Sequence, residues 1–339
     1  MGAYPSKMFA KIENVYIDSI ATTVPKNKTL SISLLKNKKL KMVSEVLGVK
    51  SSYKVKKEIT TLDLCLNSTK KILKKRRVKK EDIDILVFVT QTPDYLMPSC
   101  SSIIHHKLKL KTECITYDIN LGCSGYVYGL WNIISIMKQN KFNKGLLLVG
   151  DTISKTIKKD DFANKILFGD AGSATLLCKQ KNSKIYFHLG SEINGYDKLI
   201  LNNSGFRDFK LNCPNFYMDG KEVFNFAIRN VPKISRSICK FSKIKINQLD
   251  YFVFHQANKM MLDKIFEELE IKEKKRLFSI EKFGNTSSAS IPITLSFHKS
   301  KVANKNVNIL ISGFGAGFSY ASAILNLKQT KIFHTNFYG

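Results

Sequence analysis

The sequence predicts an α/β protein built from two similar halves. Short apolar segments alternate with amphipathic helical segments along the chain, which is the pattern of a sheet covered by helices. In addition, three segments of the first half recur in the same order in the second half. We therefore expect two α/β units, formed by residues 1–181 and 182–339.

The repeat rests on three pairs of segments with similar sequences. DIDILVFVTQTPD resembles QLDYFVFHQANK, DINLGCSG corresponds to EKFGNTSSAS, and KGLLLVGD resembles NVNILISGF. The aligned residues lie a nearly constant 162 to 166 positions apart: Ile85 with Tyr251, Cys123 with Asn285, and Gly150 with Gly313. Three segments in one order at one spacing indicate an internal duplication.

The duplication also predicts where a functional site lies. Ligands of open α/β sheets collect at the carboxyl ends of the strands. In the first half these ends carry Thr90, Gln91 and Cys123, and in the second half they carry His255 and Asn285. A pseudo-twofold axis between the halves would bring the two sets face to face in one cleft.

Length and composition are those of an ordinary globular protein. The chain has 339 residues, of which 44% are hydrophobic and 24% charged. No stretch approaches the length of a membrane span, and the N-terminal sequence lacks the pattern of a secretory signal. The seven cysteines include no CxxC pair, so we expect reduced thiols, no metal site and a cytoplasmic location.

The formal net charge of +28 suggests an acidic partner, such as nucleic acid, a membrane surface or a phosphate-bearing carrier. The longest basic run, Lys70–Lys80, is typical of the solvated end of an amphipathic helix, which we expect to begin near Thr61. The sequence has no zinc-finger spacing and no basic patch interleaved with aromatic residues. We therefore do not expect nucleic acid to be the partner.

Cys123 is the candidate nucleophile. An extended segment meets a Gly-Cys-Ser-Gly turn, and an apolar, helix-compatible run follows. This order places the sulfur at a helix N-terminus, where unpaired amides and the helix dipole favour the thiolate over the thiol. The flanking glycines allow a sharp turn and leave room for a substrate.

Two further side chains belong to the same candidate site. His255 follows the apolar strand YFVF, and Asn285 follows a Phe-Gly turn. Taken alone, His255 could be a hydrogen-bonded core histidine and Asn285 a turn-forming residue. Their positions in the repeat place both at the strand ends where Cys123 also lies, which favours a functional role. The glycine-rich segment Gly313–Tyr320 lacks the lysine of a P-loop, so it predicts a close backbone approach with an amide N–H directed at a reacting carbonyl.

Four segments in this order, YDINLGCSGY, FHQANKMM, FGNTSSASIP and SGFGAGF, resemble the β-ketoacyl-acyl carrier protein synthase III family of the thiolase superfamily. FGDAGSATLL and TPDYLMPS add to the likeness, which extends from about Tyr16 to Leu327. The resemblance implies a thiolase-like five-layered α/β/α/β/α fold and a homodimer. It also implies an acyltransferase that uses acyl-coenzyme A or acyl carrier protein thioesters as substrates and needs no further cofactor.

Carried over by motif, Cys123 is the nucleophile, with His255 and Asn285 completing the catalytic site. The backbone N–H groups of Cys123 and Ala316 would form the oxyanion hole. An asparagine offers hydrogen bonds but no proton transfer at neutral pH, which suits the decarboxylation of a malonyl thioester. The expected reaction is a decarboxylative Claisen condensation through an acyl-cysteine.

The resemblance also suggests residues with less direct roles. Met97 and Phe314 would line the substrate pocket, Met97 by reaching across the dimer. The family arginine that meets the carrier protein falls on Met260, so Lys259 and Lys264 are the candidates for carrier docking. The expected tryptophan of the coenzyme A site is missing as well, because the single Trp131 lies beyond Cys123.

Three alternatives remain open from the residues. An acyltransferase of the same fold would pass the acyl group to an amine or hydroxyl in secondary-metabolite or glycan biosynthesis. A nucleic-acid-binding protein would use the basic charge and bind polynucleotide in a salt-sensitive way. A cysteine hydrolase would need a positioned water, which the sequence does not explain.

Overall fold

The structure, a computed structural model, describes residues 8–26, 28–31, 37–140, 142–207 and 215–337. Cys213 lies outside these residues. The first half contains these strands and helices: β1 (Met8–Pro25), β2 (Lys28–Ser31), α1 (Lys38–Leu47), β3 (Ser51–Tyr53), α2 (Thr61–Arg76), β4 (Ile85–Val89), α3 (Cys100–Leu108), β5 (Ile115–Ile119), α4 (Gly125–Asn140), β6 (Lys144–Asp151), α5 (Phe162–Leu167) and β7 (Ala171–Ser191).

The second half continues from the long strand β7. Its elements are β8 (Leu199–Asn202), β9 (Asn215–Met218), α6 (Gly220–Ser242), β10 (Tyr251–Phe254), α7 (Lys259–Glu268), α8 (Ile280–Phe283), α9 (Ser290–Phe297), α10 (Lys299–Val302), β11 (Asn308–Gly315), β12 (Ser319–Asn326) and β13 (Lys331–Phe337). Two short 3-10 turns matter for the site: η7 (Ser287–Ala289) and η8 (Ala316–Phe318).

One sheet runs through the described residues in the order β10-β11-β12-β7-β6-β4-β5, and β1 pairs with both β7 and β13. In the first half β4 and β6 are parallel and β6 is antiparallel to β7. In the second half β10 and β11 are parallel and β11 is antiparallel to β12. The same pairing pattern occurs twice, as the duplicated α/β fold requires.

Strand β7 connects the two portions of this sheet. It pairs with β6 up to Cys178 and with β12 from Tyr186 onward. The strand therefore changes neighbours in the segment where the sequence suggests a boundary, although the backbone continues as one strand. The division into 1–181 and 182–339 stays a prediction.

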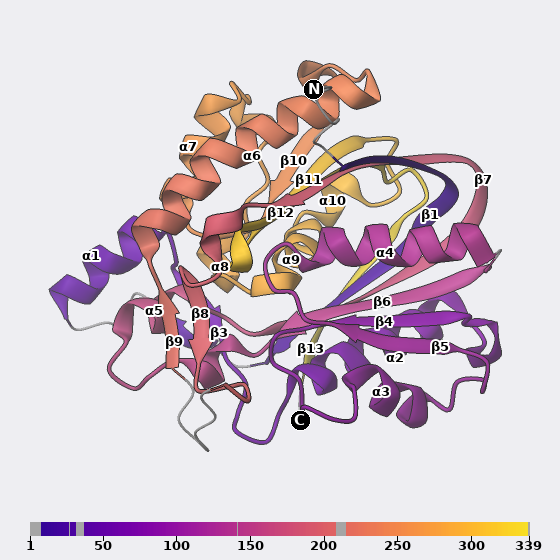
Figure 1. Ribbon diagram of the computed structural model, residues 1–339, viewed down its shortest axis with the longest axis horizontal. Helices are drawn as coiled ribbons and strands as arrows, with labels where there is room; N and C mark the ends of the chain where they lie inside the picture. The colour runs from indigo at the N-terminus through magenta and orange to yellow at the C-terminus, as the bar shows by residue number, and fades with distance from the viewer. Residues whose placement is uncertain (1–7, 27, 32–36, 141, 208–214, 338–339) are drawn as a thin grey trace.

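Side-chain alternation along the strands produces five layers (Figure 1). Alternate residues of β4, Ile85, Val87 and Val89, pack in the central core with α4 and α9, while Leu86 and Phe88 face the outer core beneath α2 and α3. β11 divides in the same way, because Ile309 and Ile311 face the central core and Leu310 faces α6 and α7. The predicted five-layered α/β fold is confirmed.

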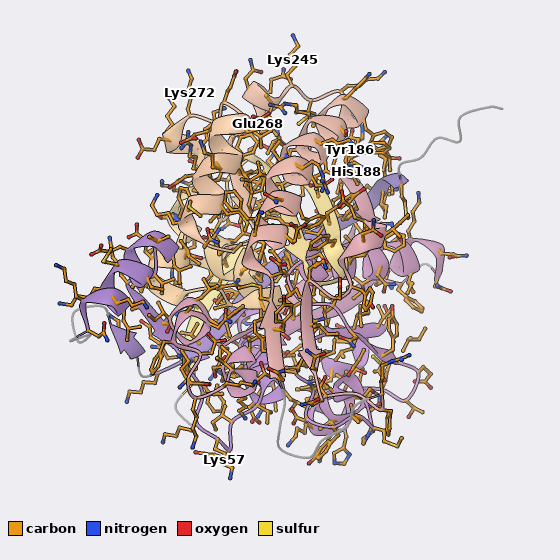
Figure 2. All side chains as sticks on the ribbon, turned by 60° about the vertical axis from the view of Figure 1, so that its left-hand side comes forward. Lys57, Tyr186, His188, Lys245, Glu268 and Lys272 are labelled. Carbon is orange, nitrogen blue, oxygen red and sulfur yellow. The ribbon has the colours of Figure 1, made fainter. Side chains whose placement is uncertain are left out.

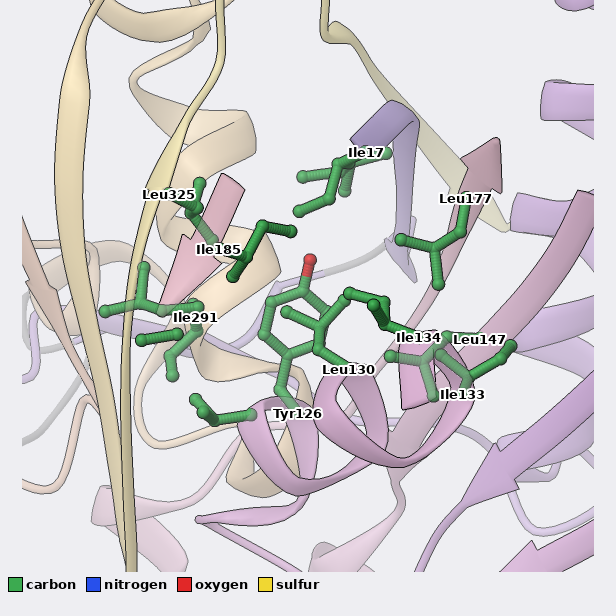
Figure 3. Close-up of a cluster of buried hydrophobic side chains, with 14 of the residues drawn as sticks. Ile17, Tyr126, Leu130, Ile133, Ile134, Leu147, Leu177, Ile185, Ile291 and Leu325 are labelled. Carbon is green, nitrogen blue, oxygen red and sulfur yellow. The ribbon is translucent and has the colours of Figure 1, made fainter. Parts of the chain in front are cut away.

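Helix α4 is the central element of the inner layer. Tyr126, Leu130, Ile133 and Ile134 are fully buried and contact both portions of the sheet (Figure 3). Helices on an ordinary surface are apolar along one stripe, whereas α4 is apolar on most sides because sheets cover it on both. This packing holds the start of α4, and with it Cys123, in a fixed place.

Helix α2 explains the longest basic run. It begins at Thr61 after a capping box between Thr60 and Asp63 and ends at Arg76, where Arg77 takes a left-handed conformation. Its last turn is rich in exposed lysine, as predicted for a solvated helix end. Lysines also extend outward elsewhere on the molecule, for example Lys57 and Lys245 (Figure 2). No described helix has the length and hydropathy needed to cross a bilayer.

Candidate active site

Cys123 lies in the turn between the end of β5 and the start of α4. The turn is closed by a hydrogen bond from Gly125 N to Gly122 O at 2.7 Å. Tyr126, three residues after the cysteine, is fully buried, so the helix start cannot move independently of the core. The side chain of Cys123 keeps partial access to the surface through the cavities described below.

The glycine-rich segment at the end of β11 passes directly over Cys123. A Cβ atom on Gly313 would lie 2.6 Å from the carbonyl oxygen of Cys123, and one on Gly315 would lie 3.0 Å from its Sγ. Neither position has space for a side chain. The predicted close backbone approach is therefore present, and it brings the neighbouring Ala316 to the wall of a cavity that Cys123 also lines.

His255 follows the last residue of β10 and is 2% exposed. Its backbone N–H donates to the carbonyl of Ser312 at 2.8 Å, which fixes the residue to β11. Its Nδ1 lies 2.7 Å from the Ser290 hydroxyl, and its ring meets the ring of Phe314 edge-on. Burial lowers the pKa of His255 to about 3, so the imidazole is neutral at physiological pH.

Asn285 follows Gly284, which holds a φ of 67° that favours glycine. Its backbone N–H donates to the Leu167 carbonyl at 2.8 Å, and its Oδ1 accepts from the Ser287 N–H at 2.9 Å. Its Nδ2 reaches the carbonyl of Ala257 only at 3.5 Å, a long contact. The amide N–H groups of Asn285 are thus available to a ligand.

Two cavities meet at Cys123. The smaller, of about 60 Å³, is lined by Cys123, His255, Asn285 and Phe314. The larger, of about 410 Å³, is lined by Cys123 and Ala316 together with residues of several loops and strands. Residues from the front half and the back half of the chain therefore converge on one sulfur atom.

The electrostatics of Cys123 differ from the sequence-based expectation. Burial, followed by the negative field of Asp151, raises the pKa of the thiol to about 12, while hydrogen bonding from the Ser287 side chain lowers it in part. The effect of the helix N-terminus does not overcome the loss of water and the neighbouring carboxylate. The resting group is a thiol, so forming the nucleophile requires a proton acceptor.

The remaining candidates lie at different distances from this site. Phe314 lines the smaller cavity, as expected of a pocket residue. Met97 is 80% exposed and lines neither cavity within this chain. Lys259 and Lys264 lie on α7, and each forms an ion pair within that helix, with Asp263 and Glu267 respectively. Their charge is partly neutralised by these partners.

The sequence reading missed Asp151, Ser287 and Phe168. Asp151 is the last residue of β6 and follows Gly150, which the internal repeat pairs with Gly313. A carboxylate at the end of a buried strand could have indicated a functional residue. Ser287 lies two residues after Asn285 and has an unusual φ of 49°. Phe168 lines both cavities.

This arrangement has the parts needed for acyl transfer. The thiol shares the lining of one cavity with Ala316, whose backbone amide can hold an oxyanion, and it shares the lining of the other with a neutral imidazole and a carboxamide. Neutral donors of this kind stabilise a developing enolate oxygen without exchanging a proton. The geometry therefore suits a covalent acyl intermediate followed by carbanion chemistry.

Comparison with known proteins gives one consistent result. Residues 117–193 match the family model for 3-oxoacyl-(acyl-carrier-protein) synthase III, and residues 239–327 match the model for its C-terminal part. A Campylobacter jejuni protein, proposed to be a 3-oxoacyl-(acyl-carrier-protein) synthase 3, is 32% identical over 95% of this chain and 96% of its own. A β-ketoacyl-(acyl-carrier-protein) synthase III of Clostridium botulinum is 32% identical over 80% of this chain and 86% of its own length.

Solved structures agree with these relatives. The crystal structure of a 3-oxoacyl-(acyl-carrier protein) synthase from Burkholderia xenovorans superposes with a TM-score of 0.92 at 29% identity. The match covers 98% of this chain and 100% of that one.

Proposed function

This chain belongs to the 3-oxoacyl-(acyl-carrier-protein) synthase III family, and we propose that it performs a decarboxylative Claisen condensation through an acyl group on Cys123. It is a condensing enzyme, that is, a transferase. The observation that carries the proposal is the convergence of Cys123, His255 and Asn285 on one cavity. Their catalytic roles are part of the proposal.

In the first step Cys123 attacks the carbonyl of an acyl thioester. The new S–C bond forms, the C–S bond of the substrate breaks, and the departing thiolate is protonated. The backbone N–H groups of Cys123 and Ala316 hold the oxyanion of the tetrahedral intermediate. Because Ala316 lines the larger cavity, the acyl chain extends into that space.

In the second step a malonyl thioester enters the side of the sulfur that His255 and Asn285 line. The His255 Nε2–H and the Asn285 Nδ2–H donate to its thioester carbonyl oxygen. Loss of carbon dioxide leaves an enolate, which these donors stabilise, and its carbon attacks the acyl-cysteine. The C–S bond of the acyl-cysteine breaks, the β-ketoacyl product leaves, and the Cys123 thiolate takes a proton from solvent to restore the thiol.

The substrates are acyl-coenzyme A or acyl carrier protein thioesters. The names of these relatives refer to the acyl carrier protein, and an acidic carrier would suit a basic chain with a net charge of +28. Lys259 and Lys264 of α7 are the proposed carrier contacts, and Lys259 begins the helix directly after the cavity residue Asn258. The described cysteines are free thiols, which agrees with the reducing cytoplasm as the site of action.

We also propose a homodimer. β5 lies at the end of the sheet order, and edge strands offer unpaired backbone groups to a second copy. Ile115 at its start is 42% exposed, and the nearby loop exposes Tyr95, Leu96 and Met97 at 61%, 61% and 80%. An apolar surface beside an open strand edge favours self-association.

Intact-mass analysis tests the proposed function. The protein is exposed to a panel of acyl-coenzyme A and acyl carrier protein thioesters, and we expect an acyl adduct that Cys123→Ala lacks. Addition of malonyl carrier protein should then release carbon dioxide and remove the adduct. An adduct on another cysteine contradicts the site. Transfer to an amine or hydroxyl without carbon dioxide release would favour the alternative acyltransferase.

A further inference from the structure

The larger cavity beside Cys123 combines an apolar lining with polar side chains. Its volume is about 410 Å³, and the acyl group of the proposed intermediate extends into it. Side chains such as Leu199, Leu201 and Phe216 form its apolar part. Apart from Cys123, the described lining residues with hydrogen-bonding side chains are Gln91, Asn120, Thr156, Tyr196, Ser204 and Ser287. A plain alkyl chain could not form a hydrogen bond with any of them.

Two of these polar side chains follow neighbouring strands. β4 and β5 are parallel, and Val89 pairs with Ile119 at their carboxyl ends. Asn120 comes directly after β5, and Gln91 comes two residues after β4. Ligands of open α/β sheets bind at the carboxyl ends of the strands, so both carboxamides lie where a substrate is expected.

Most of the other polar groups in the lining have partners or meet water. The hydroxyls of Thr156 and Ser204 donate to the carbonyls of the residues three positions earlier, at 2.8 and 2.6 Å. Asn120 and Tyr196 are exposed, so water can satisfy them. Gln91 is half-buried, and none of the described residues forms a hydrogen bond with its side-chain amide. Gln91 therefore offers both a donor and an acceptor to a ligand in the cavity.

The side chain of Gln91 lies beside the turn that carries the nucleophile. Its backbone N–H donates to Asp151 Oδ1 at 2.8 Å, which fixes the residue to the end of β6. A Cβ atom on Gly122 would collide with Gln91 Oε1 and would also lie 3.2 Å from Ser287 Oγ. The carboxamide and this hydroxyl thus flank the residue that precedes Cys123. We expect an acyl group on the cysteine to meet them with its first carbons.

The cavity is suited to a neutral polar substituent. None of the residues that line it within the described part of the chain is a lysine, arginine, aspartate or glutamate. An ionised group on the acyl chain would lose water there without gaining a charged partner, which is costly. A hydroxyl is small and uncharged, and it can accept from the Gln91 amide N–H or donate to its Oε1.

We propose that Gln91 selects acyl groups that carry a hydroxyl on the second or third carbon, counting the thioester carbonyl carbon as the first. An alkyl chain in the same place would exclude water from the amide and leave its donor and acceptor unpaired. A hydroxyl restores a hydrogen bond, so the enzyme takes a hydroxyacyl thioester in preference to the alkyl thioester of the same length. The inference rests on the proposed acyl-cysteine step and names the class of acyl group that this step takes.

The test is single-turnover acylation of Cys123, followed by intact mass, with the coenzyme A thioesters of butyrate and of both enantiomers of 2- and 3-hydroxybutyrate. In the wild type we expect one hydroxyacyl thioester to react about tenfold faster than the butyryl thioester, which is the effect of about one hydrogen bond. Gln91→Met keeps the length of the side chain and removes its hydrogen-bonding groups. In this variant the ratio of the two rates should approach one.

Leu201→Met is the matched control. It alters the packing of the same cavity with little change in volume, and it leaves the amide of Gln91 in place. We expect this variant to keep the wild-type ratio. Because the measured quantity compares two substrates within one protein, a general loss of stability or activity does not change it.

A wild-type ratio of one or less would overturn the inference, as would a preference that persists in Gln91→Met or disappears in Leu201→Met. If the butyryl thioester forms the adduct as fast as every hydroxyacyl thioester, the acyl-cysteine step stands and only the proposed selectivity is wrong.

A second measurement needs no acyl transfer. Butyramide and the 2- and 3-hydroxybutyramides can occupy the cavity and protect Cys123 from alkylation by iodoacetamide, which peptide mass mapping follows. If no thioester forms an adduct, the proposed condensing activity is wrong, and protection then decides the inference. Protection by a hydroxyamide about tenfold better than by butyramide, lost in Gln91→Met, would support it. Equal protection by all of the amides would overturn it.

Discussion

Gly315 lies against Cys123 so closely that a Cβ atom on it would be 2.6 Å from Cys123 Cβ and 3.0 Å from Sγ. The end of β11 and the turn that carries Cys123 are thus in direct van der Waals contact. The contact joins segments almost two hundred residues apart in the chain, and it explains why the end of β11 carries glycine at positions 313 and 315.

Gly315→Ala should therefore displace either the cysteine or the loop that bears Ala316. We expect Cys123 acylation to fall about 100-fold, because small displacements of reacting groups have effects of that size. Overpacking should also lower the free energy of unfolding by about 1–3 kcal/mol. Single-turnover acylation and urea denaturation measure the two effects. Gly205→Ala is the control, since a Cβ there would meet nothing within 4 Å, and equal losses in both variants would contradict the argument.

Replacing Asn285 should separate the two half-reactions. Asn285→Ala removes a donor to the enolate, so condensation should slow about 100-fold while acyl-enzyme formation persists. Asn285→Asp retains the oxygen that accepts from Ser287 N but lacks the N–H donor, so it should show the same defect. Adduct formation by mass and carbon dioxide release are followed separately. If Asn285→Asp condenses at the wild-type rate, the amide is not the donor.

His255 should make stability depend on pH in a defined direction. Its pKa falls from an ordinary value of 6.5 when unfolded to about 3 when folded. The unfolded chain therefore binds a proton below pH 6.5 that the folded chain refuses, so stability decreases as the pH falls from 6.5 toward 3. Melting temperatures across this range should fall less steeply in His255→Gln than in the wild type. Parallel curves would show that this histidine does not contribute.

The proposed dimer predicts that a charge at the exposed loop separates the subunits. Leu96→Asp places a carboxylate in the apolar surface beside β5, where desolvation on association would be costly. Light scattering coupled to size exclusion should report a dimer for the wild type and a monomer for the variant. Met42→Asp, at an exposed residue of α1 far from β5 in Figure 1, should remain dimeric. A wild-type monomer at micromolar concentration would refute the dimer.

Carrier docking through α7 predicts a difference between substrates. Reversing the charge in Lys264→Glu should raise KM for a carrier-protein thioester about fivefold, which corresponds to roughly 1 kcal/mol, and leave KM for the coenzyme A thioester nearly unchanged. The matched control is Lys245→Glu, which reverses a charge at the upper end of the molecule in Figure 2. An equal effect of both variants would indicate general attraction to a basic surface and not a docking site.

The sequence by itself determined the class of fold and the three residues at the proposed centre. Alternating strand and helix patterns and the internal repeat were sufficient, because hydrophobic periodicity is local and a duplication conserves spacing. The repeat paired Cys123 with Asn285, and the structure brings both to one cavity with His255. The predicted start of a helix near Thr61 is also confirmed, because the capping residues Thr60 and Asp63 are close together in the chain.

Only the tertiary structure decided the protonation of the site. The turn before α4 suggested a thiolate, but burial and Asp151 favour the thiol, and both effects depend on atoms brought together from distant segments. The same holds for the contacts of Asp151 with Gln91 and Ser288, which join the two halves. Electrostatic energies in a buried site depend on three-dimensional distances and on excluded water, and neither quantity is encoded by neighbours in the sequence.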